Sequence, residues 1–253
     1  MKPLILITND DGVFAKGVLA LEAIAQEFGD VVVMAPEDNS SGKSHSITPS
    51  RPLRVRNVKE SDELSIYACD GTPVDCVKLA VEYFCPRRPA LVLSGINHGS
   101  NSSINVLYSG TMGAVVEATV CGFDAIGFSL LNHSVNADFS SCEPFVRTII
   151  ADVLENGLPE NVSLNVNIPN LPVDQIKGIR VCHEAKTYWH DSFEKRIDPI
   201  GRPYWWLTGK FVCDELQEGS DEWALQNGFV SVVPTHPDFT NYPAIKQLRS
   251  RYE

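Results

Sequence analysis

The sequence lacks any run of apolar residues long enough to cross a membrane, since a spanning helix needs about 20 of them in succession. Its start, Met1-Lys2-Pro3, leads straight into a short apolar stretch without a small-residue cleavage site, so we expect no secretory signal. The seven cysteines are scattered, odd in number and without CxxC spacing, which argues against a disulfide framework. We therefore expect a cytoplasmic protein with reduced thiols and no membrane partner.

Basic residues are also scarce. The chain has 21 lysines and arginines against 32 aspartates and glutamates, a formal net charge of −11, and no dense basic stretch. Such a chain repels a polyanion at long range, so we expect no long nucleic acid as a partner. A small phosphorylated molecule stays compatible with this charge, because local dipoles, single lysines and a metal ion can hold it.

Apolar and amphipathic segments alternate over the first half of the chain. The patterns predict buried strands at residues 3–7, 30–35, 90–93 and 125–129, and helices at residues 17–28, 72–83, 110–119 and 143–154. This alternation is typical of an α/β fold with a mostly parallel sheet flanked by helices. In that architecture ligands bind outside the carboxyl ends of the strands.

The pattern changes after about residue 160, so we divide the chain into a core, residues 1–160, and a β-rich extension, residues 161–253, which completes the core. We expect strands at residues 162–168, 179–182, 204–207 and 229–233, with no helix between them before the tail. Five aromatic residues of the extension indicate either exposed arms or a subunit interface, or else the core of a small sheet. They are Tyr188, Trp189, Tyr204, Trp205 and Trp206.

Polar clusters follow three of the predicted strands. Asp10 and Asp11 are adjacent on a tight turn, where like charges raise each other's pKa unless a cation is bound. Ser41 and Asn97 follow the next strands and add a hydroxyl and an amide oxygen. Two carboxylates with neutral oxygen donors suit Mg²⁺ or Mn²⁺ and suit zinc poorly. Each residue alone fits an ordinary turn or cap, and only their shared placement favours a metal site.

A second group of residues indicates anion binding. Ser109-Gly110-Thr111 precedes a predicted helix, where hydroxyls and free backbone N–H groups bind anions, although simple N-capping explains the tripeptide equally well. Asn101 offers a further amide donor. We interpret Gly71 to Cys76 as a strand-to-helix turn capped by Thr72. The candidate acid or base histidines are His45, which we place nearest the site, His98 and His236.

Taken in order, these motifs resemble the SurE family, the stationary-phase survival proteins that act as metal-dependent 5'/3'-nucleotidases. In the first half, the resemblance rests on Ile7 to Gly12, Ala35-Pro36 with Ser41-Gly42, Gly71 to Cys76, Ser94 to Gly99, and Ser109 to Thr111. A looser match covers Gly228 to Pro234 followed by Asp238. Between them, Thr235-His236-Pro237 departs from the family pattern, which affects the local loop more than the chemistry.

The resemblance implies a Rossmann-like core and a C-terminal extension exchanged between the subunits of a homodimer or homotetramer. It implies one divalent cation per subunit, Mg²⁺ or Mn²⁺, bound by Asp10, Asp11, Ser41 and Asn97. It also implies phosphate binding by Ser109, Gly110 and Thr111, with Asn101 close by. We expect hydrolysis of nucleoside monophosphates to nucleoside and phosphate. Asp10 and Asp11 are the expected catalytic residues, and either of them can orient or deprotonate the attacking water.

Three other functions stay open at this point. Phosphatases that form an aspartyl-phosphate place their aspartates as Asp-x-Asp, whereas adjacent residues cannot project alike from an extended strand. A nucleotide-sensing protein needs the anion site but no paired carboxylates. An assembly protein with a vestigial site needs only the aromatic arm.

Overall fold

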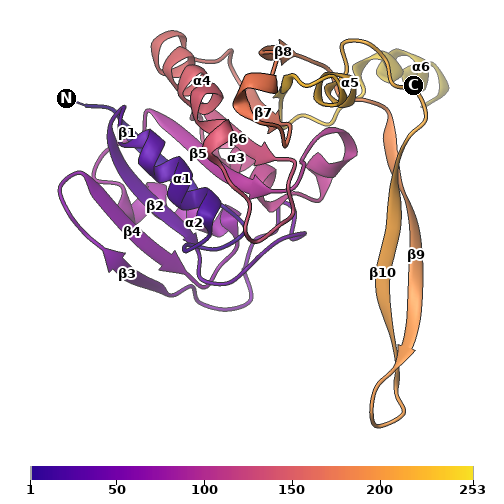
Figure 1. Ribbon diagram of the computed structural model, residues 1–253, viewed down its shortest axis with the longest axis horizontal. Coiled ribbons are helices and arrows are strands. Elements are labelled where there is room, and N and C mark those ends of the chain that lie inside the picture. Colours follow the sequence, from indigo (N-terminus) through magenta and orange to yellow (C-terminus); the bar gives the residue numbers. More distant parts are fainter. Residues whose placement is uncertain (1, 253) are drawn as a thin grey trace.

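The apolar runs of the first half form the centre of a nine-stranded sheet, which is shown in Figure 1. The computed structural model describes residues 2–252. The central strands are β1 (Leu4–Thr8), β2 (Asp30–Pro36), β5 (Leu91–His98) and β6 (Ala125–Leu130). Every residue of β1 and β6 is buried, as expected for strands covered on both faces. The four strands confirm the four that the sequence predicts in this half.

The sheet has the strand order β3-β4-β2-β1-β5-β6-β7-β11-β8. The pairs from β4 to β7 are parallel, which confirms the expected mostly parallel sheet. At one edge β3 (Val55–Lys59) runs antiparallel to β4 (Leu64–Cys69). Neither strand is among those that the sequence predicts; β3 is partly exposed along its whole length and carries no apolar run that would mark it.

Helices cover both faces of the sheet, as Figure 1 shows. Buried side chains of α1 (Lys16–Ala25) and α4 (Glu143–Asn156) belong to one apolar core. Those of α2 (Pro73–Leu79) and α3 (Gly110–Val120) belong to a second core. The packing of α1 is close, because a Cβ on Gly17 would lie 1.9 Å from the carbonyl oxygen of Ile96. These helices confirm the four predicted ones, with α2 continuing as a π-helical turn to Phe84.

The C-terminal part of the chain adds strands to the same sheet. They are β7 (Ser163–Ile168), β8 (Ile179–Val181) and β11 (Val230–Thr235). The expectation of no helix before the tail is wrong, because α5 (Asp221–Gln226) lies between the arm and β11. Its six residues are too few to show a helical period, and its only local signal is the N-cap, Ser220, which accepts the N–H of Trp223. The chain ends in α6 (Tyr242–Tyr252).

A long hairpin, here called the arm, leaves the body of the molecule (Figure 1). It consists of β9 (Thr187–Ile197) and β10 (Pro203–Cys213), which pair antiparallel over their whole length. Trp205 and Trp206 on the arm are 55% and 57% exposed. Of the two interpretations of the aromatic residues, the exposed arm is therefore confirmed and the small apolar core is wrong. Within residues 2–252, no helix is both long and apolar enough to span a bilayer.

The strand order determines where a ligand can bind. From β1 the chain continues to β2 on one side, and β5 pairs with β1 on the other. Such a reversal of direction opens a crevice at the carboxyl ends of the central strands. The polar clusters of the sequence fall there, on the turn after β1, on the loop after β2 and at the end of β5.

Candidate active site

The turn after β1 points its two carboxylates in different directions. Asn9 closes the turn, because its amide nitrogen donates to the carbonyl of Gly12 (2.9 Å) and its amide oxygen accepts the Gly12 N–H (3.2 Å). Gly12 has a φ of +109°, a conformation that other residues rarely adopt. Asp11 accepts the backbone N–H of His98 at the end of β5, at 3.2 Å. Asp10 instead lines a cavity.

Asp10 is a buried carboxyl group, only 3% exposed. Burial raises its pKa to about 6, a bond from the Thr111 hydroxyl opposes this shift, and the charge of Asp11 adds to it. That bond, from Thr111 Oγ1 to Asp10 Oδ1, is 2.6 Å long and fixes the side chain. A carboxylate that is costly to ionise without a counter-charge is the group that a bound cation stabilises most.

The raised pKa of Asp10 should make the free energy of unfolding of the metal-free protein depend on pH. The folded state holds the Asp10 proton more tightly than the unfolded state, so ionisation costs stability as pH rises from 3.8 to about 6. The loss amounts to about 3 kcal/mol and levels off above pH 6. Urea denaturation in chelator should therefore show that Asp10→Asn gains stability over the wild type from pH 4 to pH 7. If the free energies of unfolding of the two proteins differed by the same amount at every pH, this prediction would be contradicted.

The loop of residues 37–48, here called the serine loop, carries Ser41 and is anchored at several points. The N–H of Ser40 donates to the carbonyl of Asp10 (2.7 Å), and the hydroxyl of Ser44 donates to the carbonyl of Leu107 (2.6 Å). The loop also packs on α3, where a Cβ at Gly113 would lie 2.7 Å from the Ser44 carbonyl oxygen. These contacts hold Ser41 at the mouth of the cavity.

Two further anchors come from helices under the serine loop. His45 Nε2 lies 2.8 Å from Glu117 Oε2 on α3, whose other carboxylate oxygen pairs with Lys78 on α2. Burial alone would raise the pKa of Glu117, but Lys78 and His45 outweigh it and hold the pKa below its ordinary value. Thr72 caps α2, which confirms the predicted turn, and its hydroxyl also donates to the Ser46 carbonyl (2.7 Å).

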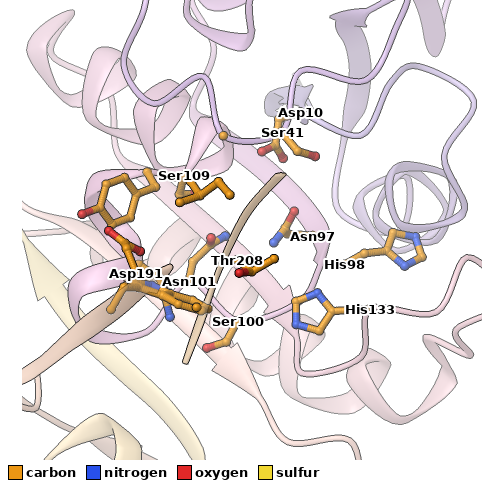
Figure 2. A pocket seen from close by; sticks show the side chains of 16 residues that line it. Asp10, Ser41, Asn97, His98, Ser100, Asn101, Ser109, His133, Asp191 and Thr208 are labelled. Carbon is orange, nitrogen blue, oxygen red and sulfur yellow. The ribbon is translucent and has the colours of Figure 1, made fainter. Parts of the chain in front are cut away.

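Asn97 lies within β5, because this strand continues to His98 instead of ending at Leu93. Its amide nitrogen donates to the carbonyl of Gly99 at 2.9 Å, which orients the side chain. Figure 2 shows the carbonyl oxygen of Asn97 on the side that faces Asp10 and Ser41. The three residues line one cavity of about 600 Å³.

These residues fit a hard divalent cation. Asp10, Ser41 and Asn97 converge on the cavity, and Asp11, which does not line it, contacts the residue that follows Asn97. No cluster of three or more histidine, cysteine, aspartate or glutamate residues occurs in the described part of the chain. Within the cavity the structure thus brings together one carboxylate, one hydroxyl and one amide oxygen, with the Asp11 carboxylate outside its lining. Oxygen donors of these kinds suit Mg²⁺ or Mn²⁺ and not zinc.

The predicted phosphate-binding residues fall into two groups. Ser109 and Asn101 line the cavity. The hydroxyl of Ser109 accepts the N–H of Met112 (3.0 Å) and keeps its own hydrogen for an anion. Asn101 donates one amide hydrogen to Ser129 (2.8 Å) and has a second to give. Gly110 and Thr111 lie against Asp10, so their part in phosphate binding stays a prediction.

Other residues line the cavity that the sequence did not mark as site residues, although Trp189 is one of the five aromatic residues noted in the extension. The arm contributes Trp189, Asp191, Leu207, Thr208 and Gly209. They stand more than 75 residues after the last of the first-half motifs, and no motif marks them. Tyr108 directly precedes Ser109, and His133 follows β6, so their positions next to a motif and a strand end were usable signals. Of the candidate histidines, His98 and not His45 lines this cavity.

The chain is similar to known proteins over nearly its whole length. A family model described as "Survival protein SurE" matches residues 5–191. A "5'-nucleotidase SurE" of Christiangramia forsetii is 53% identical over 251 residues, which cover 98% of this chain and 96% of that protein. The enzyme of the same name from Flavobacterium psychrophilum is 50% identical over 250 residues, covering 98% and 97%. The crystal structure of the SurE protein from Aquifex aeolicus superposes with a TM-score of 0.85 at 39% identity, covering 99% of this chain and all of that one.

Proposed function

The chain belongs to the SurE family of 5'-nucleotidases, and on that premise we propose that it hydrolyses nucleoside monophosphates to nucleoside and phosphate in the presence of a divalent cation. The reaction is phosphomonoester hydrolysis by water. The observation that carries the proposal is the convergence of Asp10, Ser41 and Asn97 on the cavity that Ser109 and Asn101 also line.

We assign cation binding to Asp10, Asp11, Ser41 and Asn97. When bound, a divalent cation supplies Lewis acidity toward a phosphoryl oxygen and lowers the pKa of an attacking water. Asp10 and Asp11 also orient that water or accept its proton. Ser109, at the N-terminus of α3, donates its hydroxyl hydrogen to a phosphoryl oxygen, where negative charge gathers in the transition state.

The proposal is tested by phosphate release from a panel of 5'- and 3'-nucleoside monophosphates with Mg²⁺, Mn²⁺ or chelator. We expect release from 5'-nucleotides with either metal, an activity about 10²-fold or more lower in chelator, and recovery on adding metal back. Undiminished release in chelator would refute the metal requirement. Binding of nucleotide without release would favour the sensing protein, and a trapped phospho-enzyme would favour an aspartyl-phosphate.

Two further properties belong to the same proposal. We propose that the arm joins subunits of a homodimer or homotetramer, which is supported by its extension away from the body and its exposed aromatic side chains (Figure 1). We propose that the enzyme works in a reducing compartment, the cytoplasm. All seven cysteines are free thiols, and an oxidising compartment favours paired ones.

A further inference from the structure

The root of the arm, where β9 and β10 leave the body, forms one side of the site cavity. Asp191 and Gly209 are opposite each other in the hairpin, and both line the cavity with Thr208. Figure 2 shows Asp191 and Thr208 on the side of Asn101 and Ser100, away from Asp10 and Ser41. A cavity of about 600 Å³ is far larger than a phosphate group needs and is of the size that holds a whole small ligand. The arm root therefore faces the part of the substrate beyond the phosphate.

Trp189 is the aromatic residue that the arm brings to this wall. It is 40% exposed and lines the cavity, as does Tyr108, which is 54% exposed. The indole N–H of Trp189 donates to the side-chain oxygen of Asn105 at 2.8 Å. Its ring also meets that of Phe211 edge-on, with 5.7 Å between the centroids. The orientation of the indole is thus fixed before any ligand arrives.

A buried carboxylate holds the arm root against the loop that carries Asn101 and Asn105. Asp221, fully buried at the start of α5, accepts the N–H (2.7 Å) and the hydroxyl (2.6 Å) of Ser103. It also accepts the N–H of Ala185, two residues before the arm begins, at 2.9 Å. The hydroxyl of Thr187 in turn accepts the N–H of Ile104 (3.2 Å). Because the bonds to Asp221 are buried and charge-assisted, they hold the start of the arm, and with it Trp189, firmly against the loop.

We propose that Trp189 contacts the nucleobase of the bound nucleotide and sets the preference for nucleotides over phosphomonoesters without a base. Phosphate recognition needs no aromatic side chain, whereas stacking on one is the common way of holding a planar base. Asn105 and Asp221 act through Trp189 as positioning residues. The inference rests on the proposed function, because it assumes that the phosphate lies near Ser109 and Asn101.

The test compares kcat/KM for adenosine 5'-monophosphate and for ribose 5-phosphate, which lacks the base. Trp189→Leu should lower the value for the nucleotide about tenfold or more and leave that for ribose 5-phosphate within about twofold. Trp189→Phe, which keeps an aromatic face, should recover most of the loss. Tyr83→Leu is the matched control, since Tyr83 is exposed on the π-helical turn after α2, away from the arm, and does not line the cavity; it should change neither value.

A second set of measurements tests whether Asn105 holds the indole of Trp189 in place. Asn105→Ala should lower the ratio of the two kcat/KM values in the same direction, and it should add little in the Trp189→Leu background, because both changes act on one contact. The affinity of the metal-free protein for adenosine, measured by titration calorimetry, should fall in Trp189→Leu and stay unchanged in Tyr83→Leu.

These experiments test the role of Trp189 and the proposed function separately. An equal loss for both substrates in Trp189→Leu, or an unchanged ratio with unchanged adenosine binding, would overturn the role of Trp189. Failure of the wild type to release phosphate from either substrate would instead refute the proposed function. In that case the adenosine measurement still decides whether the arm root binds a base.

Discussion

Asp10→Asn should reduce phosphate release by about 10³-fold or more while the protein stays folded. The substitution removes the charge that a cation needs but keeps the shape of the side chain, and its amide oxygen can still accept the Thr111 hydroxyl. Asp10→Ala should be equally inactive. Steady-state release of phosphate at saturating metal measures the effect, and calorimetric titration with Mn²⁺ should show weaker cation binding.

The matched control is Asp38→Asn. Asp38 is an exposed carboxylate on the serine loop, near Ser41 in sequence, but it does not line the cavity. It should retain activity within about twofold, as exposed substitutions away from a site usually do. Wild-type turnover by Asp10→Asn in a metal-replete assay would remove Asp10 from the site, and an equal loss in Asp38→Asn would show that overall charge is what matters.

The second large effect concerns Gly110, which carries no functional group. A Cβ at this position would lie 2.7 Å from Cβ of Asp10 and 2.9 Å from its Oδ2. Gly110→Ala should therefore push the Asp10 carboxyl out of place and lower kcat/KM about 10²-fold, the usual effect of a misplacement of about 1 Å in an active site. Measuring kcat/KM against the concentration of Mg²⁺ should show a higher metal requirement.

Stability distinguishes this effect from general damage. The overlap with Cβ of Asp10 should lower the free energy of unfolding of Gly110→Ala by about 1–3 kcal/mol, and its activity should be lost well below the unfolding temperature, where the variant is still folded. Val120→Ala, at an exposed position on the same helix α3, should leave activity unchanged. Full activity in Gly110→Ala would mean that Asp10 has room to move without loss of function.

For Gly110, the function that its sequence motif suggests differs from the role that its contacts indicate. Its position before a helix suggests phosphate binding, but the structure places it against Asp10, where the lack of a side chain makes room for the carboxyl group. Thr111 likewise gives its hydroxyl hydrogen to Asp10. The same tripeptide thus supports the predicted metal site, and only Ser109 of its three residues lines the cavity.

By itself the sequence determined the central strands of the sheet, the four helices that cover it and the polar residues near the ends of its strands. Those residues lie at or near the carboxyl ends of strands or at the start of a helix, and in a parallel sheet strand ends gather at one edge whatever the details of packing. Asp10, Ser41 and Asn97 are therefore predictable from local patterns, and the structure indeed brings them to one cavity.

Only the tertiary structure decided which residues of the arm line the cavity. Trp189 and Asp221 are about 80 and 120 residues away in sequence from the loop that they contact. The residues next to them in sequence show no pattern that predicts this contact. Of the arm's two exposed strands, local patterns place only part of β10, the strand predicted at residues 204–207. They place neither β9 nor the six-residue helix α5, which is too short to show a helical period. Their positions come from buried hydrogen bonds between distant segments, which exist only once the chain has folded.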